Sequence, residues 1–109
     1  MKLWVDDVRP APEGYIWCKS VNETIKEICA EEEYYKVMWF EGNPIELIDL
    51  DHDAGDFAGD GGDYIRVLDW LEQAGIVDTG YFFHLHTQNP VGRENMERII
   101  RKNGWRLVK

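Results

Sequence analysis

Three short apolar runs of this sequence end in groups of residues that could do chemistry. The groups contain carboxylates, which bind divalent cations, and imidazoles, which bind metals and move protons near neutral pH. They are Asp6-Asp7 after Lys2–Val5, Asp51-His52-Asp53 after Ile45–Leu50, and His84-Leu85-His86-Thr87 at the end of Tyr81–Leu85.

The acidic residues favour a metal site. Six aspartates and no Lys or Arg lie between positions 49 and 63. Carboxylates packed together without cations have raised pKa values or hold a metal, and oxygen-rich sites suit Mg²⁺ and Mn²⁺. As alternatives, the acids could simply end their strands, and Asp49 could be a buried acid held by hydrogen bonds. Asp56 and Asp60 are expected to be solvated loop residues. We predict Mg²⁺ or Mn²⁺, with Zn²⁺ as the third option, held by Asp6, Asp7, Asp51 and Asp53.

The histidines are candidates for proton transfer. His84 and His86 are two positions apart, so they share one face of a strand. They could act as general acid and base or ligate zinc, although an isolated core histidine is usually only hydrogen-bonded. His52, between two aspartates, is the third candidate, and we predict catalytic roles among these three residues.

Candidate phosphate-binding groups lie near the same run ends. Arg9 and Arg93 could each grip an anion through two-point contacts, with an ordinary surface charge as the alternative. Arg93 falls in the first turn of a predicted helix, where free backbone N–H groups also favour anions. Thr87 and Asn89 could donate hydrogen bonds to a bound oxyanion.

The elements that position these residues alternate along the chain. Apolar runs followed by helical patterns predict a mostly parallel sheet with crossover helices, and ligands of such sheets bind beyond the carboxyl ends of the strands. We predict one α/β domain over residues 1–109, of the receiver or flavodoxin-like type, with about five strands, helices on both faces and no helix in the first crossover. Strands are expected at Lys2–Val5, Tyr15–Cys18, Ile45–Leu50, Tyr81–Leu85 and Trp105–Val108, and helices from Val21 past Glu32, over Tyr64–Ala74 behind an Asp63 cap, and over Gly92–Lys102. Tyr34–Phe40 either extends the first helix or forms an extra turn.

Composition and charge narrow the function classes. The 21 acidic and 12 basic residues give a net charge of −9, which repels nucleic-acid backbones and anionic membranes. No apolar run approaches the length of about 20 residues that spans a membrane. Cys18 and Cys29 are expected to be reduced, buried thiols, and the chain passes from Met1 straight into a predicted strand, so we expect a cytoplasmic protein.

The arrangement resembles the phosphoacceptor receiver domain of response regulators. The resemblance rests on the acidic pair Asp6-Asp7, on Asp51 after the central strand and on Thr87 after the next. It implies Mg²⁺ binding by the acidic pair, phosphoryl transfer to Asp51 and a phosphate contact from Thr87. The histidines and the missing first helix depart from this family. Receivers also carry a lysine at the end of the last strand, where Lys109 follows Val108 here.

A narrower resemblance covers nearly the whole chain. Lys2–Pro12, Leu50–Asp53 and His84–Gly92 are similar to the cyclic-phosphate processing receiver domain family, whose receiver-like fold and activity on cyclic phosphates are thereby implied. The segment Tyr34–Asn43 is longer than expected for that family.

These observations lead to one preferred function and two rivals. We predict a metal-assisted phosphoesterase acting on a cyclic phosphate or phosphodiester, with a small phosphorylated ligand or cyclic nucleotide as its partner. The first rival is a signalling receiver that is phosphorylated on Asp51 and switches a protein partner. The second is a protein that binds a phosphorylated ligand without turnover.

Overall fold

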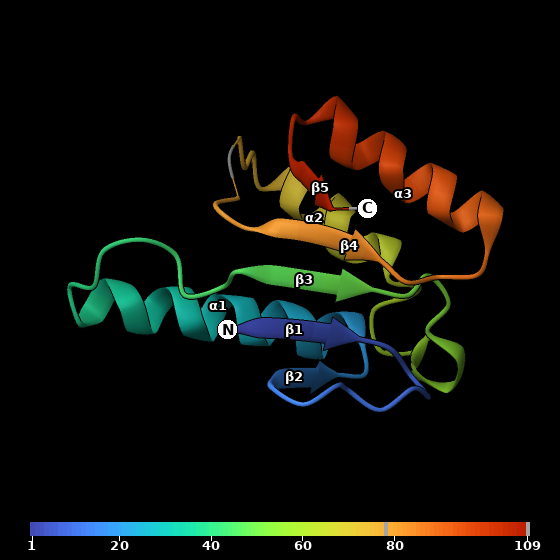
Figure 1. Cartoon of the computed structure of the whole chain (residues 1–109), viewed down its shortest axis with the longest axis horizontal. Coiled ribbons are helices and arrows are strands. Elements are labelled where there is room, and N and C mark those ends of the chain that lie inside the picture. Colours follow the sequence, from blue (N-terminus) through green and yellow to red (C-terminus); the bar gives the residue numbers. More distant parts are fainter. Residues whose placement is uncertain (78, 109) are drawn as a thin grey trace.

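Five parallel strands form one sheet in the order β2-β1-β3-β4-β5 (Figure 1). This computed structural model describes residues 1–77 and 79–108. The elements are β1 Lys2–Val5, β2 Tyr15–Cys18, α1 Val21–Val37, β3 Leu47–Leu50, the short 3₁₀ helix η1 Gly55–Phe57, α2 Ile65–Gln73, β4 Phe82–Leu85, α3 Pro90–Lys102 and β5 Arg106–Val108. The predicted receiver-like α/β class is confirmed.

The helices α1, α2 and α3 lie on one face of the sheet, unlike the prediction of helices on both faces. The crossovers β2–β3, β3–β4 and β4–β5 all step in the same direction across the sheet, and right-handed crossovers in one direction place their helices on one side. The β1–β2 connection steps the other way and has no helix, as predicted. In Figure 1, α1 and α2 pass behind the strands, α3 packs against α2, and no helix crosses the front of the sheet.

Side chains alternate between the helix-covered face and an uncovered one, which we call the open face. On β1, Leu3 and Val5 are buried beneath the helices, while Lys2 and Trp4 point to the open face. The same alternation leaves Phe82 on the open face, 44% exposed. The core therefore joins one sheet face to one helix layer; its largest fully buried members are Tyr64, Tyr81, Phe83, Leu3, Ile28, Ile45, Ile48, Leu50, Leu68, Met96, Ile100 and Val5.

The start of α1 is tied to the loop after β3. Ser20 caps the helix by accepting a hydrogen bond from the Glu23 amide at 3.0 Å, as the sequence predicts. The Ser20 hydroxyl and the Asn22 amide donate to the two carboxylate oxygens of Asp60, at 2.6 and 3.0 Å. Asp60 is an exposed loop residue, as predicted, and these bonds also fix the loop against the helix.

Helix α1 continues through Val37, so the first of the two alternatives for Tyr34–Phe40 holds for most of that segment. Two further details differ from the sequence analysis. The Asp63 side chain does not cap α2; its carboxylate accepts a hydrogen bond from the Ala54 amide at 3.0 Å. Cys18 is buried as expected, but Cys29 is exposed. None of the helices in the described residues is long and apolar enough to cross a membrane.

Candidate active site

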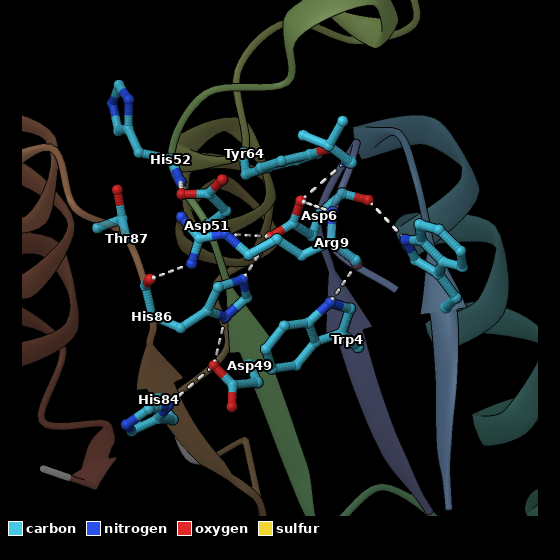
Figure 2. A network of polar contacts seen from close by, with 12 residues as sticks. Trp4, Asp6, Arg9, Asp49, Asp51, His52, Tyr64, His84, His86 and Thr87 are labelled. Carbon is cyan, nitrogen blue, oxygen red and sulfur yellow. Dashed lines mark hydrogen bonds and ion pairs between the residues drawn. The ribbon is translucent and has the colours of Figure 1, made fainter. Parts of the chain in front are cut away.

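His86 connects two carboxylates at the carboxyl ends of the central strands (Figure 2). Its Nδ1 lies 2.6 Å from Asp49 Oδ1, and its Nε2 lies 2.9 Å from Asp6 Oδ2. A ring with a carboxylate at each nitrogen is held best as an imidazolium, which donates at both ends. Burial alone would lower the pKa of His86, but the hydrogen bonds to Asp49 and Asp6 outweigh it and raise the pKa.

Asp6 is fully buried and saturated with hydrogen bonds. Its Oδ1 accepts from the backbone amides of Val8 and Arg9, both at 2.9 Å, and its Oδ2 faces His86. Burial would raise the pKa of Asp6, but the Arg9 and Val8 amides and His86 lower it below its ordinary value. The ionised Asp6 carboxylate thus fixes the conformation of the turn after β1 by accepting these backbone hydrogen bonds.

Asp49 holds both strand-end histidines. Its Oδ1 also lies 2.9 Å from His84 Nδ1, and in the parallel register Asp49 is directly opposite His84. Asp49 is buried, whereas the His84 side chain is 35% exposed. With Nδ1 directed at Asp49, His84 has its Nε2 available for other partners.

Trp4 and Arg9 enclose the His86 ring from β1. The Trp4 indole stacks on His86 with ring centroids 3.9 Å apart and planes 3° apart, which favours a cationic ring. The Trp4 Nε1–H donates to the Arg9 carbonyl at 2.9 Å, and Arg9 Nη1 donates to the His86 carbonyl at 3.2 Å. The guanidinium therefore reaches across the site toward β4 (Figure 2).

A group of carboxylates borders His86. Ligand atoms of Asp6, Asp51 and His86 lie within 4.8 Å of one another, a spacing that one cation could bridge. Asp7 is adjacent: burial raises the pKa of its carboxyl, and the negative charges of Asp6 and Asp51 add to the effect. Gly55 leaves room for the Asp7 carboxylate, because a Cβ there would overlap it.

His52 and Asp53 form a second group beside this one. His52 Nδ1 lies 2.7 Å from Asp53 Oδ1, and the two residues form a compact group with Asp63. The His52 ring lies against Gly92 at the start of α3, where a Cβ would overlap the ring. The loop after β3 thus delivers His52 to the end of β4 only because residue 92 has no side chain.

The predicted phosphate-binding residues after β4 already have structural partners. Asn89 caps α3 by accepting from the Gly92 amide at 3.0 Å, and its own amide donates to Thr87 Oγ1 at 3.1 Å. Arg93 Nη2 donates to the Thr87 carbonyl at 2.7 Å. Thr87 is buried, so these contacts first of all fix the loop that carries His86.

A polar hollow lies between the ends of β4 and β5 and one side of α3. Its volume is about 300 Å³, and it is lined by His84, Leu85, Arg93, Glu97, Arg101, Leu107 and Val108. Two arginines and a histidine face one glutamate, so the hollow is locally cationic in a protein with a net charge of −9. Such a surface attracts anions.

A family model, the cyclic-phosphate processing receiver domain, matches residues 1–102. The chain belongs to this family. No curated protein and no solved structure matches it. The five-stranded parallel sheet agrees with the receiver domain that the family description names.

This cyclic-phosphate processing receiver domain brings together the residues that the sequence singled out. Asp6, Asp51 and His86 meet directly, His84 joins them through Asp49, and Arg9 covers them. His52 and Asp53 form the neighbouring group, and Thr87, Asn89 and Arg93 hold the loop between the two groups. Their chemical roles stay predictions. Lys109, which the sequence analysis compared with the receiver lysine, lies outside the described residues.

Two members of the site were missed in this receiver domain. Asp49 was assigned at most a buried structural role, and Trp4 was assigned none. Both could have been found from the period of two along a strand, because Trp4 is two positions before Asp6 and Asp49 is two before Asp51. Parallel register then aligns Trp4, Asp49 and His84 in one row across the sheet.

Proposed function

We propose that this receiver domain is a metal-assisted phosphoesterase that hydrolyses a cyclic phosphate or phosphodiester. In this reaction a water oxygen bonds to phosphorus, one phosphorus–oxygen ester bond breaks, and the leaving oxygen takes a proton. The proposal rests on the position of His86, which is held between Asp6 and Asp49 and lies beside Asp51. Imidazole and carboxylate groups therefore meet at one site at the strand ends.

The donor set suits a divalent cation. The raised pKa of Asp7, caused by burial and then by the charges of Asp6 and Asp51, is the expected result of crowding acids where a cation belongs. Carboxylate oxygens favour Mg²⁺ and Mn²⁺, and Zn²⁺ also accepts carboxylate ligands. Asp6, Asp7 and Asp51 would hold the ion, with Asp53 as the remaining candidate. When bound, it would neutralise negative charge on the phosphate.

His84 is the strongest candidate for moving the proton. Asp49 fixes its Nδ1, which sets the tautomer and orientation of the ring and leaves Nε2 to take or give a proton. His86 has both nitrogens occupied, so its part is to present positive charge and to hold Asp6 and Asp49 in place. His52, with Nδ1 at Asp53, is suited to be the second acid or base.

The cationic hollow gives the substrate a place beside His84. Arg93 and Arg101 line it together with His84, and each arginine is steadied by one partner, the Thr87 carbonyl and Glu97 respectively. Arginine forks match phosphate oxygens in two-point contacts. Arg9, which reaches across from β1, would hold the anion from the opposite side.

The direct test is a screen for hydrolysis. Cyclic 2′,3′- and 3′,5′-nucleotides and bis(p-nitrophenyl) phosphate are incubated with the protein and Mg²⁺, Mn²⁺ or Zn²⁺, and products are resolved by phosphorus NMR. We expect turnover that a chelator abolishes and a bell-shaped rate against pH. His84→Gln should reduce the rate by about 10²–10⁴-fold, as for loss of a general acid or base.

Asp56→Asn is the matched control, because Asp56 is an exposed loop acid outside the site. It should keep the activity of the parent. Equal rates for His84→Gln, His52→Gln and the parent would remove the histidines from the mechanism. Tight ligand binding without product would instead support a non-catalytic binding protein.

Phosphorylation of Asp51 is a second candidate function. Asp51 is only partly buried, unlike Asp6, so a phosphodonor could reach it; Asp7 is partly buried as well. It follows the central strand β3 and lies beside the acidic pair, the place of the phosphoacceptor in receivers. Labelling by acetyl phosphate that is lost in Asp51→Asn, with no diester hydrolysis, would favour this candidate.

A further inference from the structure

The end of α1 exposes an unusual amount of apolar surface. We call residues Tyr34–Phe40 the aromatic tip; its exposed apolar members are Tyr34, Val37, Met38, Trp39 and Phe40. Tyr34 and Tyr35 each make an edge contact with Phe40, so the tip is a packed unit. Contiguous exposed apolar patches are rare on monomers and mark interaction sites.

The tip exists because α1 is longer than the sheet it covers. A helix of 17 residues is about 25 Å long, whereas a strand of 4 residues spans about 13 Å. The fully buried residues of α1 (Val21, Thr24 and Ile28) all belong to its first half. Its last turns project beyond the start of the strands (Figure 1). They add nothing to the buried core of this chain.

The backbone at Trp39 is held in an unfavourable conformation that displays the indole. Trp39 has φ of 59°, the only positive φ of a non-glycine residue in the described part of the chain. The left-handed region costs roughly 1–2 kcal/mol for such a residue, and glycine usually occupies this place after a helix. Backbone hydrogen bonds from the Trp39 and Phe40 amides to the Lys36 and Tyr35 carbonyls close the helix end and support this conformation, while Trp39 itself is 91% exposed.

A groove at the same end of the molecule is suited to receive the tip. This open-face groove has a volume of about 440 Å³ and is lined by Lys2, Asn43, Ile45, Glu46, Leu47, Gly80, Phe82 and Val108. It lies over the starts of β1, β3 and β4, on the uncovered side of the sheet. Phe82 and Val108 are exposed there, so the groove offers aromatic and aliphatic contacts.

Charges around the two surfaces are complementary. Glu32, Glu33 and Glu41 surround the aromatic tip and are exposed. Lys2 lines the groove, and the Arg106 guanidinium lies over the Phe82 ring at 5.5 Å. In the opposite sense, Lys36 of the tip matches Glu46 of the groove. An acidic apolar projection that carries one lysine, and an apolar groove that carries Lys2 and Glu46 with Arg106 nearby, thus occur on the same chain.

We propose that two copies of this chain form a dimer in which the aromatic tip of each copy docks in the open-face groove of the other. Because tip and groove lie at one end of the molecule, a two-fold axis there lets both contacts form at once and closes the assembly. Trp39 is the anchor, a role for which large aromatic side chains are favoured at interfaces. The strand-end histidines and acids do not line the groove, and Val108 is the residue that the groove shares with the polar hollow beside His84.

The proposal is tested by molar mass in solution. Light scattering after size exclusion and sedimentation equilibrium should show a concentration-dependent dimer for the parent chain. Trp39→Ser and Phe82→Arg should each weaken it by about 30-fold or more, as for loss of a central anchor. Val91→Ser, at an exposed site on α3 at the other end of the molecule, is the matched control and should leave the dimer unchanged.

Mixing the two variants gives a sharper result. Neither variant alone can form an intact contact, but a mixed pair has one, between the tip of Phe82→Arg and the groove of Trp39→Ser. We therefore expect heterodimers in the mixture at concentrations where each variant alone is monomeric. Circular dichroism confirms that each variant is folded; Met38→Ser and Lys2→Glu replace any that is not.

Two outcomes would overturn the proposal. One is a parent chain that stays monomeric up to about 1 mM, the weak end of specific association. The other is a dimer that none of the tip or groove variants weakens. Neither outcome bears on phosphoester hydrolysis, because hydrolysis is measured separately and the varied residues Trp39 and Phe82 are not among those assigned to the proposed activity.

Discussion

Trp4 and His86 lie face to face, with ring centroids 3.9 Å apart and planes 3° apart. The pair joins β1 to the residue that follows β4, across the intervening β3. An indole face stabilises a cation placed over it, so Trp4 supports the charged form of His86 that Asp6 and Asp49 require. The aromatic contact and the two ion pairs therefore all stabilise the protonated form of His86.

Removing the indole should weaken this arrangement. We expect Trp4→Leu to lower the pKa of His86 and to lower the free energy of unfolding by about 2 kcal/mol, through lost stacking and burial. Trp4→Phe keeps an aromatic face but loses the bond to the Arg9 carbonyl, so it separates the two contributions. Imidazole NMR titrations and urea unfolding measure both effects. An unchanged titration of His86 in Trp4→Leu would show that the indole does not support the cation.

The stability of the metal-free protein should fall as pH rises. The pKa of His86 is raised in the folded state, so its contribution is fully present below the ordinary histidine pKa of about 6.5 and is lost as pH passes the raised value. Urea unfolding midpoints in the presence of a chelator, measured from pH 6 upward, should show this decline. His86→Gln should lack it, and a parallel decline in that variant would assign the effect to other groups.

Asp49→Asn should be costly, because one buried oxygen serves two histidines. We expect a loss of about 3 kcal/mol in unfolding free energy near pH 6, and a smaller loss at high pH where the imidazoles are neutral. The pKa of His86 should fall in the same variant. Asp53→Asn is the control: its carboxylate is exposed and pairs with His52 at the surface, so it should cost less than about 1 kcal/mol.

Divalent cations should stabilise the protein through Asp7 and Asp51. Saturating Mg²⁺ or Mn²⁺ at about 100 times its dissociation constant contributes about 2.7 kcal/mol, which appears as a higher Tm. Asp7→Asn and Asp51→Asn should lose most of this gain, while the exposed Asp56→Asn keeps it. Mn²⁺ should also broaden the NMR resonances of His86 before those of the aromatic tip. Equal broadening at both ends of the molecule would argue against a defined ion site.

The sequence allowed the strand ends to be predicted well, and the reason is local. Each apolar run stops at an acid or histidine, so β1 and β4 were placed with the correct functional ends. The convergence of Asp6, Asp51 and His86 then followed from the rule that parallel strands share a carboxyl edge. The role of Asp49 did not follow, because it depends on register across the sheet and on its position on the open face.

The one-sided helix layer was also missed, for a topological reason. The number and spacing of helices in the sequence fit coverage of either face, and only the strand order decides which faces they cover. The exposure of Cys29 and of the aromatic tip was missed as well, because their residue types favour burial. Cys29 lies on the solvent-facing side of α1 next to the buried Ile28, while the aromatic tip lies where the helix extends past the sheet.

The absence of helices over the open face affects how a molecule reaches His84. In a sheet covered on both sides, a strand-end histidine is approached only through the loops at the strand tips. Here Trp4 and His84 are partly exposed on the uncovered face of the sheet, on either side of the buried Asp49. If the proposed hydrolysis holds, an extended phosphate ester could approach His84 along this face without a lid having to open.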